Sequence, residues 1–136
     1  MTHVPAVLKA AVEQRASRRC EYCRLSQAGQ EARFHIDHVL PIKHGGNTTL
    51  ANLCLACVSC SLRKGAKTHA IDPESGSSVP LFDPRRNDWG EHFCWREVHI
   101  FGLTPTGRAT VAILRMNRPL IVEIRREEAL LGRHLS

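Results

Sequence analysis

The sequence predicts a mixed α+β fold in which a metal ion holds a strand-loop-strand-helix unit together. Two observations predict it. The first is a pair of Cys-x-x-Cys motifs, Cys20 to Cys23 and Cys57 to Cys60. The second is the segment between them, where an alternating stretch, a turn-rich stretch, a short apolar stretch and a helix-compatible stretch follow one another. Metal ligands and polar residues suited to chemistry therefore gather in about a third of the chain.

The chain of 136 residues has about the length of one domain, whose modest core a structural metal could supplement. We expect a single domain over residues 1–136. Its parts are expected to be an N-terminal helix, the core unit and a loop-rich, mostly helical C-terminal support, at residues 1–19, 20–67 and 68–136.

A formal net charge of +6 favours an anionic partner, with nucleic acid as the first candidate. The N-terminus lacks the apolar core of a signal peptide, and no run of about 18 apolar residues occurs. We therefore expect an intracellular, cytoplasmic protein that is not in a membrane. In a reducing compartment, six cysteines indicate metal ligands or buried thiols rather than a disulfide framework.

The first helix is predicted from Pro5 to about Arg18, because Val7, Leu8, Ala11 and Val12 recur with helical spacing on one face. This helix leads directly to Cys20. A basic cluster at its end is compatible with a solvated helix terminus and with a phosphate contact alike, and it consists of Arg15, Arg18 and Arg19.

Alternation from Arg33 to His38 predicts a half-buried strand, with Phe34, Ile36 and His38 on one side. Pro41 and the Gly45-Gly46 pair interrupt regular pairing and indicate a connecting loop. A second extended segment is predicted over Leu50–Ala56, followed by a basic helix from Cys57 to about Lys67.

Residues 68–90 are predicted to be a loop-rich connection with an extended piece at Val79–Pro84, anchored by the aromatic side chains of Trp89, Phe93 and Trp95. Val98–Leu103 is a predicted strand, and Thr104-Pro105 predicts a helix start with threonine at the cap. In a last helix, we expect an apolar stripe of Leu120, Ile121, Ile124 and Leu131, with residues 125–128 outside it.

Two Cys-x-x-Cys pairs can complete a tetrahedral shell of four thiolates, which suits a structural zinc ion. Cys54, Cys57 and Cys60 form two overlapping pairs, and we choose Cys57 and Cys60 because Cys54 falls in the extended segment. We expect Cys54 and Cys94 to be buried free thiols. A redox role for either pair would need alternating strands and helices, which the pattern does not predict.

Asp37 and His38 place a hard oxygen ligand beside a base that titrates near neutral pH. Hydrolysis of a phosphodiester needs an activated water and a cation that stabilises charge on the phosphate. Adjacent strand residues point to opposite faces, so both side chains can serve one site only if the strand end twists or bulges. Pro41 favours such a change of direction.

In combination these motifs resemble the HNH (His-Asn-His) endonuclease family, the ββα-metal nucleases, in its zinc-containing branch. The resemblance covers about residues 20–65 and implies a zinc-clamped ββα-metal core. It rests on Cys20-x-x-Cys23, Asp37-His38-Val39-x-Pro41, Gly45-Gly46, Asn52-Leu53, Cys57-x-x-Cys60 and Arg63-Lys64-Gly65.

The resemblance implies a metal-dependent DNA endonuclease in which His38 activates water and Asp37 binds a single divalent ion, magnesium or manganese. It also implies that Asn52 ties the loop together and helps to hold His38. The third family position, a histidine or asparagine that completes the ion site, falls on Ser61, whose shorter side chain departs from the pattern. His35, on the strand face of Asp37, and His44, in the loop, are candidates to compensate. His35 is equally compatible with a role behind the ion's ligands or at the surface, and His44 with a substrate contact or an exposed position.

Basic residues beside this site are predicted to contact DNA phosphates with little sequence preference, namely Lys43, His44, Arg63, Lys64 and Lys67. A solvated basic face is the alternative for them. Two other functions stay open: a catalytically weakened, zinc-stabilised module that binds DNA, because of Ser61, and a structural zinc domain that binds protein.

Overall fold

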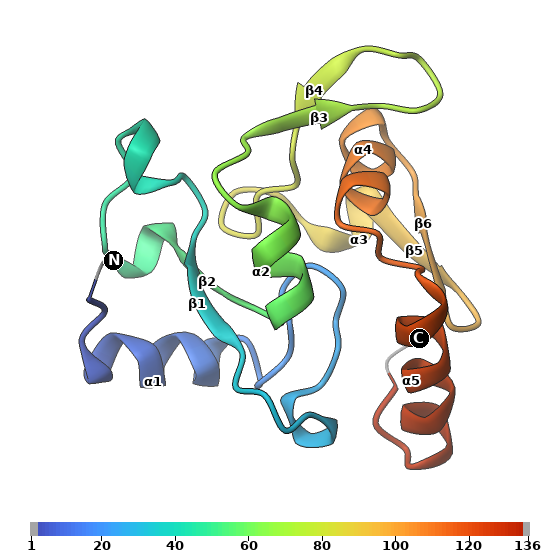
Figure 1. Ribbon diagram of the computed structural model, residues 1–136, viewed down its shortest axis with the longest axis horizontal. Coiled ribbons are helices and arrows are strands. Elements are labelled where there is room, and N and C mark those ends of the chain that lie inside the picture. The colour runs from blue at the N-terminus through green and yellow to red at the C-terminus, as the bar shows by residue number, and fades with distance from the viewer. Residues whose placement is uncertain (1–2, 135–136) are drawn as a thin grey trace.

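The computed structural model describes residues 3–134 and has an α+β architecture, as expected (Figure 1). Its α-helices are α1 (Ala6–Arg15), α2 (Val58–Lys64), α3 (Trp89–His92), α4 (Pro105–Ile113) and α5 (Pro119–Leu130). Its strands form antiparallel pairs: β1 (His35–His38) with β2 (Leu53–Ala56), β3 (His69–Ile71) with β4 (Ser78–Pro80), and β5 (Phe93–Arg96) with β6 (His99–Gly102). Short 3-10 turns lie at Gln27–Gly29, Ile42–His44 and Leu50–Asn52.

Helix α1 packs beneath the β1-β2 hairpin and is shorter than predicted (Figure 1). It ends at Arg15 because Ser17 and Arg18 adopt positive φ angles of 54° and 56°, which no α-helix accommodates. The Arg15 guanidinium donates to the carbonyl oxygens of Leu50 and Leu53, at 2.9 and 2.6 Å. Arg15 therefore fastens α1 to the start of β2.

The predicted strand, loop, strand and helix are all present between His35 and Lys64. In the hairpin, His35 lies opposite Ala56 and His38 opposite Leu53. The second strand begins at Leu53 rather than Leu50, because Leu50–Asn52 form a 3-10 turn. All four residues of β2 are buried, since α1 and α2 both contact this strand.

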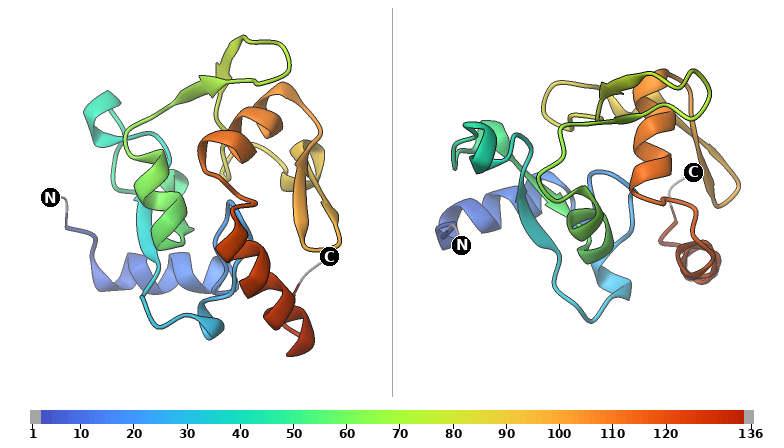
Figure 2. Two further views of the ribbon diagram at one scale, coloured as in Figure 1. Left: turned by 45° about the vertical axis from the view of Figure 1, so that its right-hand side comes forward. Right: turned by 45° about the horizontal axis from the view of Figure 1, so that its top comes forward.

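The C-terminal part contains the predicted helices and more strand than expected. Helix α4 starts as predicted, with Thr104 Oγ1 accepting the Gly107 amide at 3.0 Å and Pro105 in the first turn. The β3-β4 hairpin falls in the segment expected to be loop-rich, and β5 was not predicted. Helix α4 packs against β6 and against the β3-β4 hairpin, as the two views of Figure 2 show.

The buried face of α5 differs from the predicted stripe. Leu120 and Leu131 are 66% and 63% exposed, whereas Arg125 and Glu128 are buried. The Arg125 guanidinium donates to the Val98 carbonyl oxygen at 3.0 Å and lies over the ring of Trp95. These partners allow a charged side chain to take a core position. The prediction is confirmed for Ile121 and Ile124, which face the core, and was wrong for Leu120, Leu131, Arg125 and Glu128.

Aromatic side chains anchor the loop-rich connection, as predicted, and also join it to the first cysteine pair. Trp89 packs against Phe93 with ring centroids 5.1 Å apart, and its indole Nε1 donates to the Tyr22 carbonyl oxygen at 2.8 Å. Phe82 meets both Tyr22 and Phe93 edge to face. Helices long and apolar enough to cross a membrane are absent from residues 3–134.

Candidate functional site

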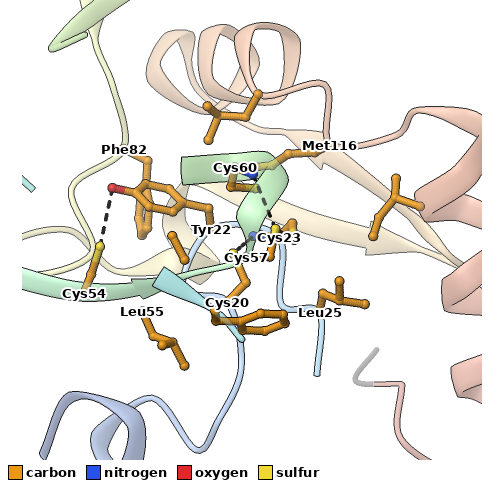
Figure 3. Close-up of a cluster of buried hydrophobic side chains, with 14 of the residues drawn as sticks. Cys20, Tyr22, Cys23, Leu25, Cys54, Leu55, Cys57, Cys60, Phe82 and Met116 are labelled. Atoms are coloured by element: carbon orange, nitrogen blue, oxygen red, sulfur yellow. Dashed lines mark hydrogen bonds between the residues drawn. The ribbon is translucent and has the colours of Figure 1, made fainter. Parts of the chain in front are cut away.

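Four cysteines from the two predicted pairs converge in the core beside α2 (Figure 3). The sulfur atoms of Cys20, Cys23, Cys57 and Cys60 all lie within 4.8 Å of one another, and all four residues are buried. The chain reaches this arrangement because the first pair lies in the turn after α1, while Cys57 caps the N-terminus of α2. The segment between the pairs contains the whole β1-β2 hairpin.

The geometry of this cluster fits a tetrahedral zinc site. Four sulfurs bound at about 2.3 Å to one zinc ion lie about 3.8 Å from each other, and Cys23 Sγ lies 3.7 Å from Cys57 Sγ. The amides of Cys23 and Cys60 each donate to the first sulfur of their own pair at 3.4 Å, which favours a thiolate there. The neighbouring cysteines, and then burial, raise the pKa of Cys60. A bound divalent cation would instead lower this pKa, because it stabilises the thiolate.

The other two cysteines lie outside this cluster, in agreement with the choice of Cys57 and Cys60. Cys54 is buried, and its sulfur is 3.7 Å from the Tyr22 hydroxyl (Figure 3). Burial raises the pKa of Cys54 well above its ordinary value, so its thiol stays protonated. Cys94 is half-buried in β5.

Asp37 lies on the side of β1 that faces α2. Its side chain is 19% exposed, and its Oδ2 atom is buried without a hydrogen-bond partner among residues 3–134. The nearest cation is the ammonium of Lys64, at 3.8 Å from Oδ2. Burial raises the pKa of Asp37, while Lys64, the His38 amide and the imidazoles of His38 and His35 oppose that rise. The carboxylate is thus poorly solvated, and a further cation would stabilise it.

His38 is the last residue of β1, and its imidazole turns toward the loop instead of α2. Its Nε2 atom lies 3.0 Å from Thr48 Oγ1. The hairpin register stays regular through His38, so no bulge brings the imidazole to the side of Asp37. The two side chains flank the end of the strand, where the chain bends toward Pro41. Nothing in the sequence pattern singled out Thr48.

Asn52 links the two ends of the loop between the strands. Its Oδ1 accepts the Leu40 amide at 2.8 Å, and its Nδ2 donates to the carbonyl oxygens of Leu40 and Asn47 at 3.0 and 2.9 Å. Gly46 packs so closely here that a Cβ atom would lie 1.7 Å from the Leu40 carbonyl oxygen. Gly45 has a φ angle of 92°, which favours glycine. The Gly-Gly pair and Asn52 thus build one compact loop beside His38.

Ser61 lies on α2 and contacts His35 on β1. The distance between Ser61 Oγ and His35 Nδ1 is 2.9 Å. His35 and Asp37 are two residues apart on a strand and therefore share a face, as do Ser61 and Lys64 on the helix. Two pairs of side chains consequently meet across the interface between β1 and α2. They are His35 with Ser61 and Asp37 with Lys64.

The predicted DNA-contacting residues divide into two groups. Lys43, His44 and Lys67 are exposed, and Arg63 is half-buried with its Nε donating to Ser59 Oγ at 3.1 Å. Lys64 is only 2% exposed, and its ammonium donates to the His38 carbonyl oxygen at 3.2 Å. The assignment of Lys64 to a phosphate contact was therefore wrong, because this cation points into the protein.

The strand pair, the helix and the cysteine cluster together define a ββα unit with a metal-binding core. Residues 20–67 match the family model described as HNH endonuclease, a family of nucleases. This part of the chain therefore matches an HNH domain, and the resemblance in its motifs is confirmed. Searches of curated proteins and of solved structures give no significant match.

Proposed function

We propose that this protein is a metal-dependent endonuclease that hydrolyses phosphodiester bonds of DNA. The observation that carries the proposal is the Asp37-His38 pair at the end of β1 in an HNH domain, beside α2 and the loop that Asn52 closes. The exposed cations Lys43 and Lys67 supply phosphate contacts that do not depend on base sequence. The four-cysteine cluster holds a structural zinc ion, which supports the fold and takes no part in cleavage.

In this proposal His38 accepts a proton from the attacking water. Its Nε2 contact with Thr48 orients the ring, and the Lys64 ammonium holds the His38 backbone through its carbonyl oxygen. Asp37 provides a carboxylate for a magnesium or manganese ion, which when bound stabilises negative charge at the phosphate. The Oδ2 atom of Asp37 supports this assignment, because it is buried, accepts no hydrogen bond among residues 3–134 and has the Lys64 ammonium no closer than 3.8 Å.

The test is nicking of supercoiled plasmid by zinc-loaded protein with magnesium or manganese. We expect cleavage by the wild type and a loss of about a hundred-fold to ten-thousand-fold in His38→Ala, the range for removal of a general base. The matched control is His99→Ala, on β6, which should cleave like the wild type. Cleavage that survives His38→Ala, or none by the wild type with either ion, would refute the proposal.

Two observations favour a second candidate, a zinc-stabilised module that binds DNA without cutting it. Ser61 replaces the usual metal ligand, and the Lys64 ammonium lies beside Asp37, where its charge opposes a second cation. This candidate predicts salt-sensitive DNA binding without nicking by the wild type. It also predicts that Ser61→Asn gains nicking activity.

A further inference from the structure

The interface between β1 and α2 contains a histidine that the proposed reaction leaves without a role. His35 is exposed on the face of β1 that carries Asp37, two residues further along the strand. Residues at this spacing are about 7 Å apart along the backbone, so their side chains can approach one cation. The His35 imidazole is also among the groups whose charge opposes the raised pKa of Asp37, as expected for neighbours.

The hydrogen bond between His35 and Ser61 orients the imidazole. A neutral imidazole has one N–H and one lone pair, on different ring nitrogens. When Nδ1 donates to Ser61 Oγ at 2.9 Å, the lone pair is on Nε2 and is available to a metal ion. Metal-binding histidines commonly donate their other N–H to an oxygen, which fixes the tautomer and the ring direction.

From this geometry we infer that His35 Nε2 joins Asp37 in binding the divalent ion, and that Ser61 acts by orienting His35 instead of binding the ion itself. The inference rests on the proposed function, because it assigns a second ligand to the same ion. It also accounts for Ser61 at the third family position: the ligand atom comes from β1, and α2 supplies its hydrogen-bond partner. The buried Oδ2 of Asp37, which accepts no hydrogen bond among residues 3–134, lies on the same face.

A cavity beside His35 and Ser61 gives an ion and a phosphate access to the His35 imidazole. The cavity has a volume of about 710 Å³ and is lined by His35 and Ser61 together with Phe34 and Ile36 of the first strand region. Lys9, Arg33 and Glu13 also line it, and Glu13 pairs with Arg33 at 3.1 Å. Together these three side chains give the wall one net positive charge, which suits a DNA backbone. Magnesium and manganese sites commonly have one or two protein ligands, with water and substrate phosphate completing the shell. His35 at the cavity and Asp37 behind it on the same strand face give two protein ligands, which fits that pattern.

The test is electron spin-echo spectroscopy of Mn²⁺ bound to zinc-loaded protein without DNA, which detects a directly bound imidazole nitrogen. We expect this nitrogen coupling in the wild type and in His38→Gln, and its loss in His35→Gln. The dissociation constant for Mn²⁺ should rise about ten-fold or more in His35→Gln. In Ser61→Ala the coupling should persist while the affinity falls by a smaller factor. Unchanged zinc content and melting temperature verify that each variant is folded.

Nitrogen coupling that survives His35→Gln, or that disappears in His38→Gln instead, would overturn the inference. Absence of Mn²⁺ binding by the wild type would also overturn it. The nicking assay separates this failure from failure of the proposed function. If His35→Gln binds Mn²⁺ and nicks like the wild type, the inference is wrong and the endonuclease stands. If the wild type shows the coupling but never nicks, the ion site stands and the endonuclease is wrong.

Discussion

Asn52 satisfies three backbone groups of the loop that separates β1 from β2. Asn52→Asp preserves the shape of the side chain but replaces the donating amide with an oxygen that faces two carbonyl oxygens. We expect the free energy of unfolding to fall by about 2 kcal/mol, because each lost hydrogen bond contributes about 1 kcal/mol. Urea denaturation followed by circular dichroism measures this difference.

The matched control is Asn47→Ala in the same loop. Asn47 offers Asn52 its backbone carbonyl oxygen, which the substitution retains, and its own side chain is exposed. We expect a loss of less than about 1 kcal/mol. Equal losses in the two variants would show that the Asn52 side chain does not hold the loop.

The residues around Asp37 show which features of a site a sequence can predict and which it cannot. The Asp37-His38 pair was recognisable because an oxygen ligand and a base stood together among metal-binding motifs. The contact between His35 and Ser61 spans 26 positions, and Lys64 reaches His38 across the same separation. Neither contact can be recognised from neighbouring residues in the sequence. Because Lys64 lies in a basic segment, it was predicted to contact a DNA phosphate, and its burial contradicts that prediction.

At the level of elements, the β3-β4 hairpin is tied to α4 by one buried carboxylate. The Asp72 carboxylate accepts hydrogen bonds from Arg108 Nε and Nη2, both at 3.0 Å. It also accepts hydrogen bonds from the Glu74 amide and the Ser75 hydroxyl. The Arg108 guanidinium first, and then Ser75 and the amide, hold the pKa of Asp72 well below its ordinary range. The folded chain therefore binds fewer protons at this site than the unfolded chain does.

This difference predicts an acid dependence of stability that Asp72→Asn removes. Because the folded pKa lies below the unfolded value of about 3.9, the stabilisation by Asp72 is complete above that value and is lost as the pH falls further. The gap in unfolding free energy between wild type and Asp72→Asn should be constant from about pH 5 to 7 and should narrow below about pH 4. Urea denaturation across this pH range measures it.

Glu74→Gln is the control, because Glu74 contacts the same Arg108 at 3.2 Å but its side chain is 72% exposed. An exposed ion pair contributes little, so this variant should follow the wild-type acid dependence. A gap for Asp72→Asn that does not change with pH would contradict the role of its charge.

Elements with a strong start signal were predicted better than short strands. Thr104-Pro105 marks a helix through local cap chemistry, and α4 begins there. Strands β3 and β4 have three residues each, too few to show an alternating pattern, and their pairing depends on contacts with α4. Arg125 also depends on contacts that are distant in the sequence. A charged residue is predicted to be exposed unless its buried partners are known.

At the scale of the whole molecule, the cysteine cluster should decide whether the chain folds. We expect the purified protein to contain about one zinc ion per chain and a strong chelator to abolish its cooperative thermal transition. Cys60→Ser should lose the zinc ion, because a tetrahedral thiolate shell needs all four sulfurs. Metal analysis by mass spectrometry and thermal denaturation check both expectations.

Cys94→Ser is the matched control, since Cys94 lies in β5 outside the cluster. It should retain full zinc content. Zinc loss in both variants, or a wild-type protein without zinc, would contradict the assignment of the cluster.

A single domain predicts one unfolding transition for both parts of the chain. The two tryptophans, Trp89 and Trp95, belong to the C-terminal part, while cobalt substituted at the cysteine cluster absorbs light through its thiolate ligands. Trp89 and Phe82 contact Tyr22, and Arg85 pairs with Glu21, so the two parts share an interface. Tryptophan fluorescence and cobalt absorption should therefore change at the same urea concentration.

Two separate transitions would show that residues 68–136 form a domain of their own. Cobalt is the appropriate probe because it reports the cluster directly, whereas circular dichroism averages over the whole chain. As a control, the cobalt-substituted protein should give the same fluorescence midpoint in urea as the zinc protein.

Features that depend on residue identity and short spacing could be predicted from the sequence alone. These are the two cysteine pairs, the Asp37-His38 strand end, the Gly45-Gly46 loop and the capped start of α4. Each follows from ligand chemistry, backbone conformation or local hydrogen bonding within a few residues. The same features were enough to predict an HNH core.

Only the tertiary structure decided which cations face solvent and which partners orient His35 and His38. Lys64 turns inward because α2 packs against β1, and Ser61 meets His35 across that same interface. Arg125 on α5 is buried because Val98 and Trp95 of the β5-β6 hairpin contact its guanidinium. These contacts depend on how elements pack in space, and the free energy of each depends on burial and distance that no local pattern encodes.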